Sequence, residues 1–171
     1  MEDFGTQVVP VIPRLRRYAR ALTGGHFTAD DLVQDTLERA WTKRHLWREG
    51  SDLRAWMFTV MHNVYVNQIR ARVADTAMPL DVEALNVPVR DHSADMLEVA
   101  DIDAALRRLP DDQREVLLLV ALEQLSYGET AAVLGIPIGT VMSRLFRARE
   151  RIRVLLGGAP VTAPAVLKVI K

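Results

Sequence analysis

The sequence predicts an all-α fold in which two small helical domains are joined by a flexible acidic linker. Three observations support this fold class. Apolar residues recur at intervals of three and four over most of the chain, as on the buried face of a helix, and strand-forming residues do not alternate. A stretch with two prolines and little helical periodicity lies near the middle. The formal charge changes sign there, so two basic parts flank an acidic one.

The first domain is predicted to cover residues 1–72 and to begin with two helices. A short basic amphipathic helix is expected over residues 13–22, and two consecutive glycines end it. The next helix is expected to start with Thr28 as its N-cap, paired with Asp31 in a capping-box-like arrangement, and to run to about residue 45. The apolar stripe expected on this helix contains Leu32, Val33, Thr36, Leu37, Ala40 and Trp41.

A third helix is predicted over residues 53–72. Gly50 breaks the chain before it, and either Ser51 or Asp52 is expected to cap its first turn. Trp56 belongs to the apolar stripe of this helix, so its indole is expected in the core.

Residues 73–92 are predicted to form the linker. Residues 1–72 carry 11 Lys and Arg against 8 Asp and Glu, residues 73–103 carry 1 against 8, and residues 104–171 carry 10 against 6. The formal net charge of the whole chain is zero, which alone would argue against a nucleic-acid partner. Contact with a polyanion depends on local patches, however, and both flanking parts are basic.

The second domain is predicted to cover residues 93–156. Its first three expected helices span residues 93–109, 111–125 and 126–134. The fourth is expected to start at Pro137 or Gly139 and to run to about residue 156. Pro110 separates the first two, and the second has an apolar centre that is expected to be buried on most sides. The tail, residues 157–171, ends in an apolar stretch to which no pattern assigns a role.

Residues 126–141 have the spacing of a helix-turn-helix. Ala131 and Ala132 are the small residues expected where the two helices cross. Gly135 is expected in the turn, because a left-handed backbone conformation favours glycine. The apolar residues expected to hold the second helix against the first are Val133, Leu134, Ile136 and Val141. A plain helical hairpin with a glycine turn is the alternative.

The second helix of this motif is predicted to present a basic face to DNA. At about 100° per residue its core face contains Val141, Leu145, Ala148, Ile152 and Leu155. Residues 144–153 contain five arginines and one acid, and an arginine can hold guanine bidentately or bind phosphate. The residues predicted to contact DNA are Thr140, Ser143, Arg144, Phe146, Arg147, Arg149 and Arg151. A solvated charged face is the alternative.

Several classes of protein are disfavoured by the composition. The chain has no cysteine, so a disulfide framework and a Cys-based metal site are excluded. The four histidines are scattered without a ligand pair, so neither a metal, a cofactor nor catalysis is expected. The N-terminus does not resemble a secretory signal, and no apolar run is long enough to span a membrane.

Three segments together resemble one known family. Residues 30–41, DDLVQDTLERAW, and residues 53–63, LRAWMFTVMHN, are similar to region 2 of the sigma-70 family of RNA polymerase sigma factors. Residues 111–153, which contain QREVLLL and LSYGETAAVLGIPIGTVMSRLFRAR, are similar to region 4. Two such domains and a short linker are the layout of the extracytoplasmic-function (ECF) subfamily.

The resemblance implies a bacterial, cytoplasmic transcription initiation factor that is not an enzyme and takes no small-molecule substrate. Its implied partners are core RNA polymerase, through the β′ clamp and the β flap, promoter DNA at the −35 and −10 elements, and an anti-sigma factor. The acidic linker would either thread the polymerase channel that later holds RNA or serve as a disordered spacer.

The resemblance also implies a role for individual residues. The residues implied to dock on a basic coiled coil of the β′ subunit are Asp31, Gln34, Asp35 and Glu38. The residues implied to contact melted −10 DNA are Trp47, Arg48, Ser51, Asn63, Asn67 and Arg70, with Trp47 and Asn63 forming a pocket for a flipped base. Met142 and Asn67 differ from the residues that are frequent at these positions in the family. The promoter sequence that family members recognise is therefore not carried over to this chain.

Two other classes of protein compete with this interpretation. A repressor or response-regulator effector could carry the same helix-turn-helix, but it would not need the acidic helix or the Trp47 and Asn63 pair. A nucleic-acid enzyme is the third class. Its candidate carboxylates, at residues 30–31 and 111–112, are better explained by helix N-termini, where acids are stabilising.

Overall fold

The computed structural model describes residues 3–75 and 94–158, and these residues contain helices and no β-strand. The predicted all-α fold class is therefore confirmed. The first half contains α1 Phe4–Val8, η1 Val9–Val11, α2 Ile12–Thr23, α3 His26–Thr42, η2 Arg44–Leu46 and α4 Leu53–Asp75. The second half contains α5 Ala94–Arg107, α6 Asp111–Leu117, η3 Leu118–Leu122, α7 Tyr127–Leu134 and α8 Ile138–Leu155.

The predicted linker and tail fall mainly outside the described residues. Residues 73–75 are the exception for the linker, because α4 continues through them to Asp75. Residues 157–158 are the described part of the tail. No single helix in the described ranges has the length and hydropathy of a membrane span; α7 and α8 meet such a criterion only together, as a pair bent by 103°.

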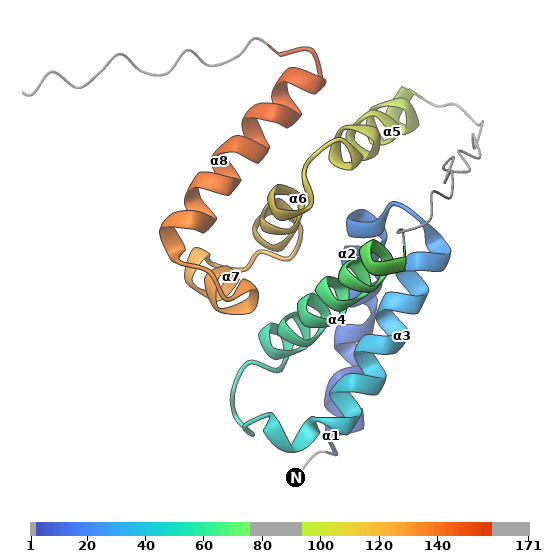
Figure 1. Ribbon diagram of the computed structural model, residues 1–171, viewed down its shortest axis with the longest axis vertical. Coiled ribbons are helices and arrows are strands. Elements are labelled where there is room, and N and C mark those ends of the chain that lie inside the picture. The colour runs from blue at the N-terminus through green and yellow to red at the C-terminus, as the bar shows by residue number, and fades with distance from the viewer. Residues whose placement is uncertain (1–2, 76–93, 159–171) are drawn as a thin grey trace, which may run out of the picture.

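In the first half, α2, α3 and α4 pack side by side around an apolar core (Figure 1). The buried residues of α2 are Leu15, Tyr18, Ala19 and Leu22, which share one face at intervals of three and four. Tyr18 meets Phe58 of α4 edge-on, with 5.2 Å between ring centroids. The helices predicted for this half are therefore present, although their ends differ.

The start of α3 corrects the predicted cap. The helix begins at His26, with Gly25 as N-cap, so Thr28 lies in the first turn and donates from Oγ1 to the Gly25 carbonyl at 3.1 Å. The cause is Gly24, whose φ of +71° ends α2 and places Gly25 in an extended conformation from which α3 starts at once. Asp31 therefore does not complete a capping pair.

The two tryptophans assigned to apolar stripes are less buried than predicted. Trp41 is 53% exposed, because it lies near the end of α3 where the neighbouring helices no longer cover it. Trp56 packs against the core but is only partly buried. Both contact Phe4 of α1, a short helix that the sequence pattern did not predict.

The helix predicted over residues 111–125 changes its hydrogen bonding halfway. Regular α-helix ends at Leu117, and residues 118–122 form a π-helical turn. The amide of Glu123 then donates to the Leu118 carbonyl at 3.0 Å, and Gln124 takes a φ of +57°. This wider turn directs Glu123 into the protein, where its side chain is 1% exposed.

The helix-turn-helix is confirmed in α7 and α8. Ser126 caps α7 in a complete capping box with Glu129, and Gly135 ends the helix with a φ of +64°. One predicted detail is wrong, because Ala132 is exposed while Thr130 is fully buried. The crossing therefore uses Thr130 and the half-buried Ala131.

The two halves pack against each other, and residues of both belong to one hydrophobic cluster. Contacts between α2 and α6 and between α4 and α7 bring the halves together (Figure 1). Polar groups cross the same boundary. Arg17 lies 2.9 Å from the buried Glu123 carboxylate, His62 Nδ1 lies 2.7 Å from Glu115 Oε1, and Arg114 donates to the Leu22 carbonyl at 3.1 Å.

Burial also raises the pKa of two tyrosine side chains. Desolvation raises the pKa of Tyr65 to about 12, and the Asp111 carboxylate across the boundary adds to the rise. Burial raises the pKa of Tyr18 well above its ordinary value. Both phenols are therefore neutral in the folded protein at ordinary pH.

Candidate nucleic-acid interface

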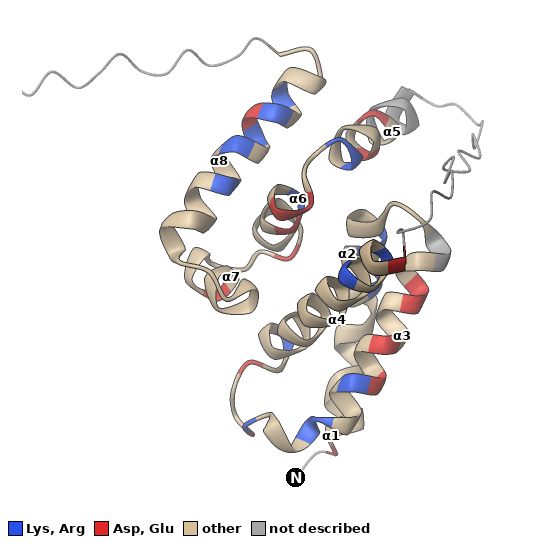
Figure 2. Ribbon diagram, viewed as in Figure 1, with Lys and Arg blue, Asp and Glu red and all other residues tan. Residues whose placement is uncertain are grey.

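Helix α8 presents a polar and basic face on the side opposite its core contacts. Val141, Leu145 and Ala148 are buried as predicted, whereas Ile152 and Leu155 are only partly buried. Figure 2 shows basic residues in successive turns of α8. The exposed members of the predicted DNA-contacting set are Ser143, Phe146, Arg147, Arg149 and Arg151, and the partly buried members are Thr140 and Arg144.

The arginines of α8 differ in whether the protein already holds them. Arg144 Nε lies 3.4 Å from Asp112 of α6, and Arg153 is held by Glu150 one turn before it. Arg147, Arg149 and Arg151 form no ion pair with any residue in the described ranges. These three guanidinium groups are therefore free to bind an anion.

An apolar ridge also lies on the exposed part of α8. Ile138, Met142 and Phe146 follow each other at four-residue intervals and are 52%, 53% and 62% exposed. Only Phe146 was predicted as a contact residue. The sequence feature that could have identified Ile138 and Met142 is their four-residue spacing from Phe146, on a face of the helix other than the core face. Apolar groups on a recognition helix can contact the methyl group of thymine.

The residues predicted for −10 contact form two groups in the structure. Asn63, Asn67 and Arg70 lie exposed along one face of α4 and line a cavity of about 410 Å³. The α3 side of this cavity contains Arg39 and Lys43, two cations that sequence reasoning did not include. Their signal was their spacing of four residues at the end of a helix that precedes the loop.

Trp47, Arg48 and Ser51 belong to the connection between α3 and α4 and do not line that cavity. Ser51 Oγ donates to the Arg48 carbonyl at 2.6 Å, which stabilises the turn. Trp47 is partly buried, with its ring centroid 5.9 Å from that of Phe4. Its Nε1 is buried and has no hydrogen-bond partner in the described part of the chain. The structure therefore does not bring Trp47 and Asn63 into one pocket.

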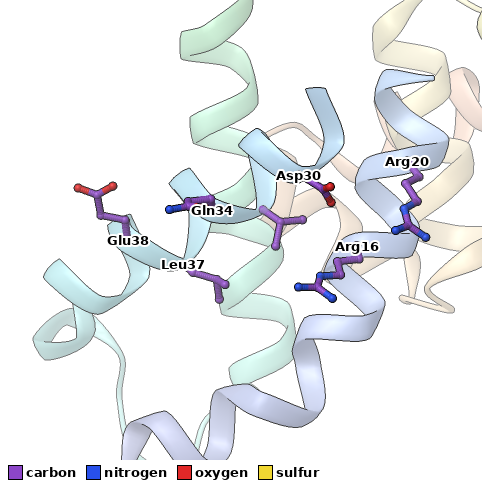
Figure 3. Close-up of a pocket in the computed structure, with 7 residues that line it drawn as sticks. Arg16, Arg20, Asp30, Gln34, Leu37 and Glu38 are labelled. Atoms are coloured by element: carbon purple, nitrogen blue, oxygen red, sulfur yellow. The ribbon is translucent and has the colours of Figure 1, made fainter. Parts of the chain in front are cut away.

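The predicted docking residues form an exposed stripe on α3. Asp31, Gln34, Asp35 and Glu38 are all exposed, and Figure 2 shows the acidic residues along this helix. The stripe borders a groove of about 630 Å³ between α2 and α3. Figure 3 shows Arg16 and Arg20 extending from α2 on one side of this groove and Gln34 and Glu38 from α3 on the other. On the opposite flank, Asp35 accepts a hydrogen bond of 2.7 Å from Gln68 of α4.

No group of three or more His, Asp or Glu side chains in residues 3–75 and 94–158 could hold a metal ion. The exposed surfaces offer charged groups, hydrogen-bonding groups and aromatic rings. The exposed stripe of α3 is acidic, whereas the exposed face of α8 and the cavity between the end of α3 and α4 contain basic residues.

Comparison with known proteins matches each half of the chain to a sigma-factor domain. Residues 8–62 match the model of the Sigma2 domain of PhyR, and residues 100–152 match that of Sigma-70, region 4. The chain is 37% identical to the ECF RNA polymerase sigma factor EcfG of Rhodopseudomonas palustris over 87% of this chain and 82% of that protein. It is 32% identical to the ECF RNA polymerase sigma factor SigE of Mycolicibacterium smegmatis over 82% of this chain and 56% of that longer protein.

Two solved structures share the arrangement. One is the sigma factor RpoE in complex with the anti-sigma factor NepR from Bartonella quintana, with a TM-score of 0.77, 37% identity, and coverage of 91% of this chain and 98% of that one. The other is CnrH in complex with the cytosolic domain of CnrY, with a TM-score of 0.66, 29% identity, and coverage of 90% and 86%. This chain belongs to the ECF family of RNA polymerase sigma factors, which are transcription factors that direct transcription.

Proposed function

We propose that this sigma factor directs core RNA polymerase to promoters through three separate surfaces on three helices. The acidic stripe of α3 binds polymerase, α8 binds duplex −35 DNA, and the exposed face of α4 binds melted −10 DNA. The observation that carries this proposal is that each surface is exposed and has the charge that its partner requires.

The −35 contact is proposed for the N-terminal half of α8. In a helix-turn-helix the second helix lies in the major groove, and residues near its start approach the base edges. Arg147 is free of ion pairs among the described residues and exposed, so it can hold guanine bidentately, while Arg149 and Arg151 contact phosphates. Thr140 and Ser143 add hydroxyl groups at the same end. Ser143 Oγ donates to the Thr140 carbonyl at 3.1 Å in the free protein.

The −10 contact is proposed for Asn63, Asn67 and Arg70, with Trp47 stacking on an unpaired base. A carboxamide offers both a donor and an acceptor to a base edge, which a melted strand exposes. Trp47 already contacts the Phe4 ring in a tilted arrangement and is only partly buried, so a base would stack on the part of the indole that stays exposed. Arg48 and Ser51 shape the connection next to it.

Polymerase docking is proposed for Asp31, Gln34, Asp35 and Glu38, which would face a basic coiled coil in the β′ clamp. Three carboxylates on a rigid helix provide electrostatic attraction, and Gln34 provides a hydrogen-bonding group. The second half is proposed to contact the β flap. We further propose an anti-sigma partner, supported by the two similar sigma factors whose structures were solved with anti-sigma proteins.

Run-off transcription tests the proposal directly. The purified protein and core polymerase are incubated with genomic promoter fragments, and specific transcripts are expected only when both are present. A pull-down with core polymerase accompanies the assay. Absence of core binding would favour a repressor with the same helix-turn-helix, and core binding without any transcript would contradict an autonomous initiation factor.

A further inference from the structure

We propose that Arg39 of α3 and Lys43, the C-cap residue of that helix, bind the sugar-phosphate backbone of the melted −10 strand. They do so in the cavity where α4 presents Asn63 and Asn67. The inference deepens the −10 part of the proposed function and rests on it. It divides the site into a phosphate-binding wall on α3 and a base-contacting wall on α4.

The placement of the cations is the first support. Arg39 and Lys43 are four residues apart, so they lie on the same side of the C-terminal end of α3. Both line the cavity of about 410 Å³, together with Asn63, Asn67 and Arg70 of α4. Two separate helices thus contribute cations and carboxamides to one concave surface, which a single solvated charged face would not do.

The availability of the cations is the second support. Arg39, Lys43 and Arg70 are exposed and form no ion pair within the described ranges. Two other basic residues of the first half are already engaged within the protein. Arg17 is bound to Glu123, and Arg44 stacks on the Trp41 ring at 5.2 Å. The cavity therefore keeps three positive charges without internal neutralisation.

The chemistry of the cavity fits a strand of nucleic acid. Unpaired cations bind phosphates without regard to sequence, whereas Asn side chains can distinguish base edges. A cation pair one helical turn apart can contact neighbouring phosphates of one strand. The carboxylates nearest to these cations along α3 are Glu38 and Asp35, and neither lines the cavity. Gln68 already donates to the Asp35 carboxylate at 2.7 Å.

Arg39 also lines the adjacent groove with Asp35 and Glu38, whereas Lys43 does not. This difference matters for the test, since Asp35 and Glu38 belong to the proposed polymerase-docking stripe. Lys43→Gln removes a charge from the −10 cavity alone. Arg39→Gln removes one from the border of both surfaces, so core binding must be measured for each variant.

The experiment measures binding of holoenzyme to a fork-junction DNA with a single-stranded non-template −10 region, taken from a promoter that the protein transcribes. Lys43→Gln, Arg39→Gln and Arg39→Lys are compared with Arg108→Gln. The control loses the same charge at an exposed, unpaired position among the described residues of the second half. Affinity is measured over a series of salt concentrations.

Each Gln variant is expected to weaken binding on the order of tenfold at low salt, since a charge-assisted hydrogen bond is lost. The slope of log affinity against log salt should become shallower by about 0.7 for each lost contact with a single strand. Arg39→Lys should retain the wild-type salt slope. The fold-decrease in affinity caused by each Gln variant should stay the same when bases in the −10 strand are changed.

Unchanged salt slopes in both Gln variants, with wild-type holoenzyme binding normally, would overturn the inference. So would a loss that depends on the base sequence, or a loss of core binding that accounts for the weaker DNA binding. Failure of the proposed function has a different signature, because the wild-type holoenzyme would then bind the fork-junction DNA no better than core polymerase alone.

Discussion

At the scale of single residues, Arg147 is the position on α8 with the clearest expected effect. Arg147→Ala should cost about 1–3 kcal/mol in discrimination between a −35 element and the same element with a changed guanine, because a bidentate contact is lost. Binding of holoenzyme to the two duplexes measures it. Arg151→Ala is the matched control, expected to weaken both complexes equally. An equal loss for Arg147→Ala would make it a phosphate contact.

Asn63 is the corresponding position in the first half. Asn63→Ala should reduce binding to −10 single strands about tenfold and change the base preference, since a carboxamide that pairs with a base edge is removed. Core polymerase binding should stay unchanged, because Asn63 lies on α4 and outside the docking stripe. A variant that loses core binding would contradict this assignment.

Tyr65 gives the free energy of unfolding a dependence on pH. The unfolded chain releases this phenolic proton near pH 10, whereas the folded protein holds it until about pH 12. The folded state therefore binds more protons in this window, and stability falls as the pH rises through it. Between pH 10 and about pH 12, the free energy of unfolding measured by urea titration should fall less for Tyr65→Phe than for the wild type. Parallel losses in both proteins would refute the assignment, since Tyr18 is common to both.

Residue-level expectations failed where the backbone conformation or the packing of a neighbouring helix decides the environment of a side chain. Thr28 has the chemistry of a cap, but the left-handed Gly24 lets the helix start three residues earlier, with Gly25 as its N-cap. Trp41 has the periodicity of a core residue, but no element covers it fully at the end of α3. Arg39 and Lys43 became candidates only when α4 was seen beside α3, because spacing alone does not show what two helices enclose.

At the scale of elements, the long helices followed from periodicity because each buries a continuous stripe. The helix-turn-helix followed from its glycine and its small residues. Two short elements did not follow. Helix α1 has five residues and no distinctive cap, and it forms because Phe4 packs against three tryptophans. The π-helical turn exists because Glu123 pairs with Arg17, a residue 106 positions away.

The role of α1 can be tested through its central side chain. Phe4 lies 5.9 to 6.1 Å from the rings of Trp41, Trp47 and Trp56. Phe4→Ala should lower the free energy of unfolding by about 1–3 kcal/mol, since a partly buried aromatic contact is lost. Denaturant titration followed by tryptophan fluorescence measures both stability and environment. Thr6→Ala, at an exposed position of the same helix, is the control, and equal effects of both changes would show that Phe4 has no special role.

At the scale of the whole molecule, the packing of the two halves is the feature that the sequence could not show. The pattern predicted two domains and a linker, and the contacts between α4 and α7 and between α2 and α6 arise only from the tertiary arrangement. Glu123 is central to them. Its carboxylate is buried against the half-exposed Arg17, and its carbonyl accepts from Arg54 at 3.3 Å.

Glu123→Gln should weaken the closed arrangement, because a buried ion pair becomes a neutral contact with weaker attraction. The expected loss is about 1–3 kcal/mol. Distance distributions between fluorophores on α3 and α8 should broaden toward longer values. Glu150→Gln removes an ion pair within α8 and is the matched control, expected to leave the distances unchanged. Unaltered distances in both variants would show that this pair does not hold the halves together.

The contact between His62 and Glu115 links this packing to promoter binding. His62 lines the −10 cavity on one side, and its Nδ1 meets a carboxylate of the second half on the other. Separation of the halves would withdraw the Glu115 carboxylate from His62, and the wall of the cavity that His62 forms would become more electropositive. If the cavity binds the melted strand as proposed, that strand would bind the separated form more tightly than the closed one. By reciprocity, the bound strand would then favour the separated form.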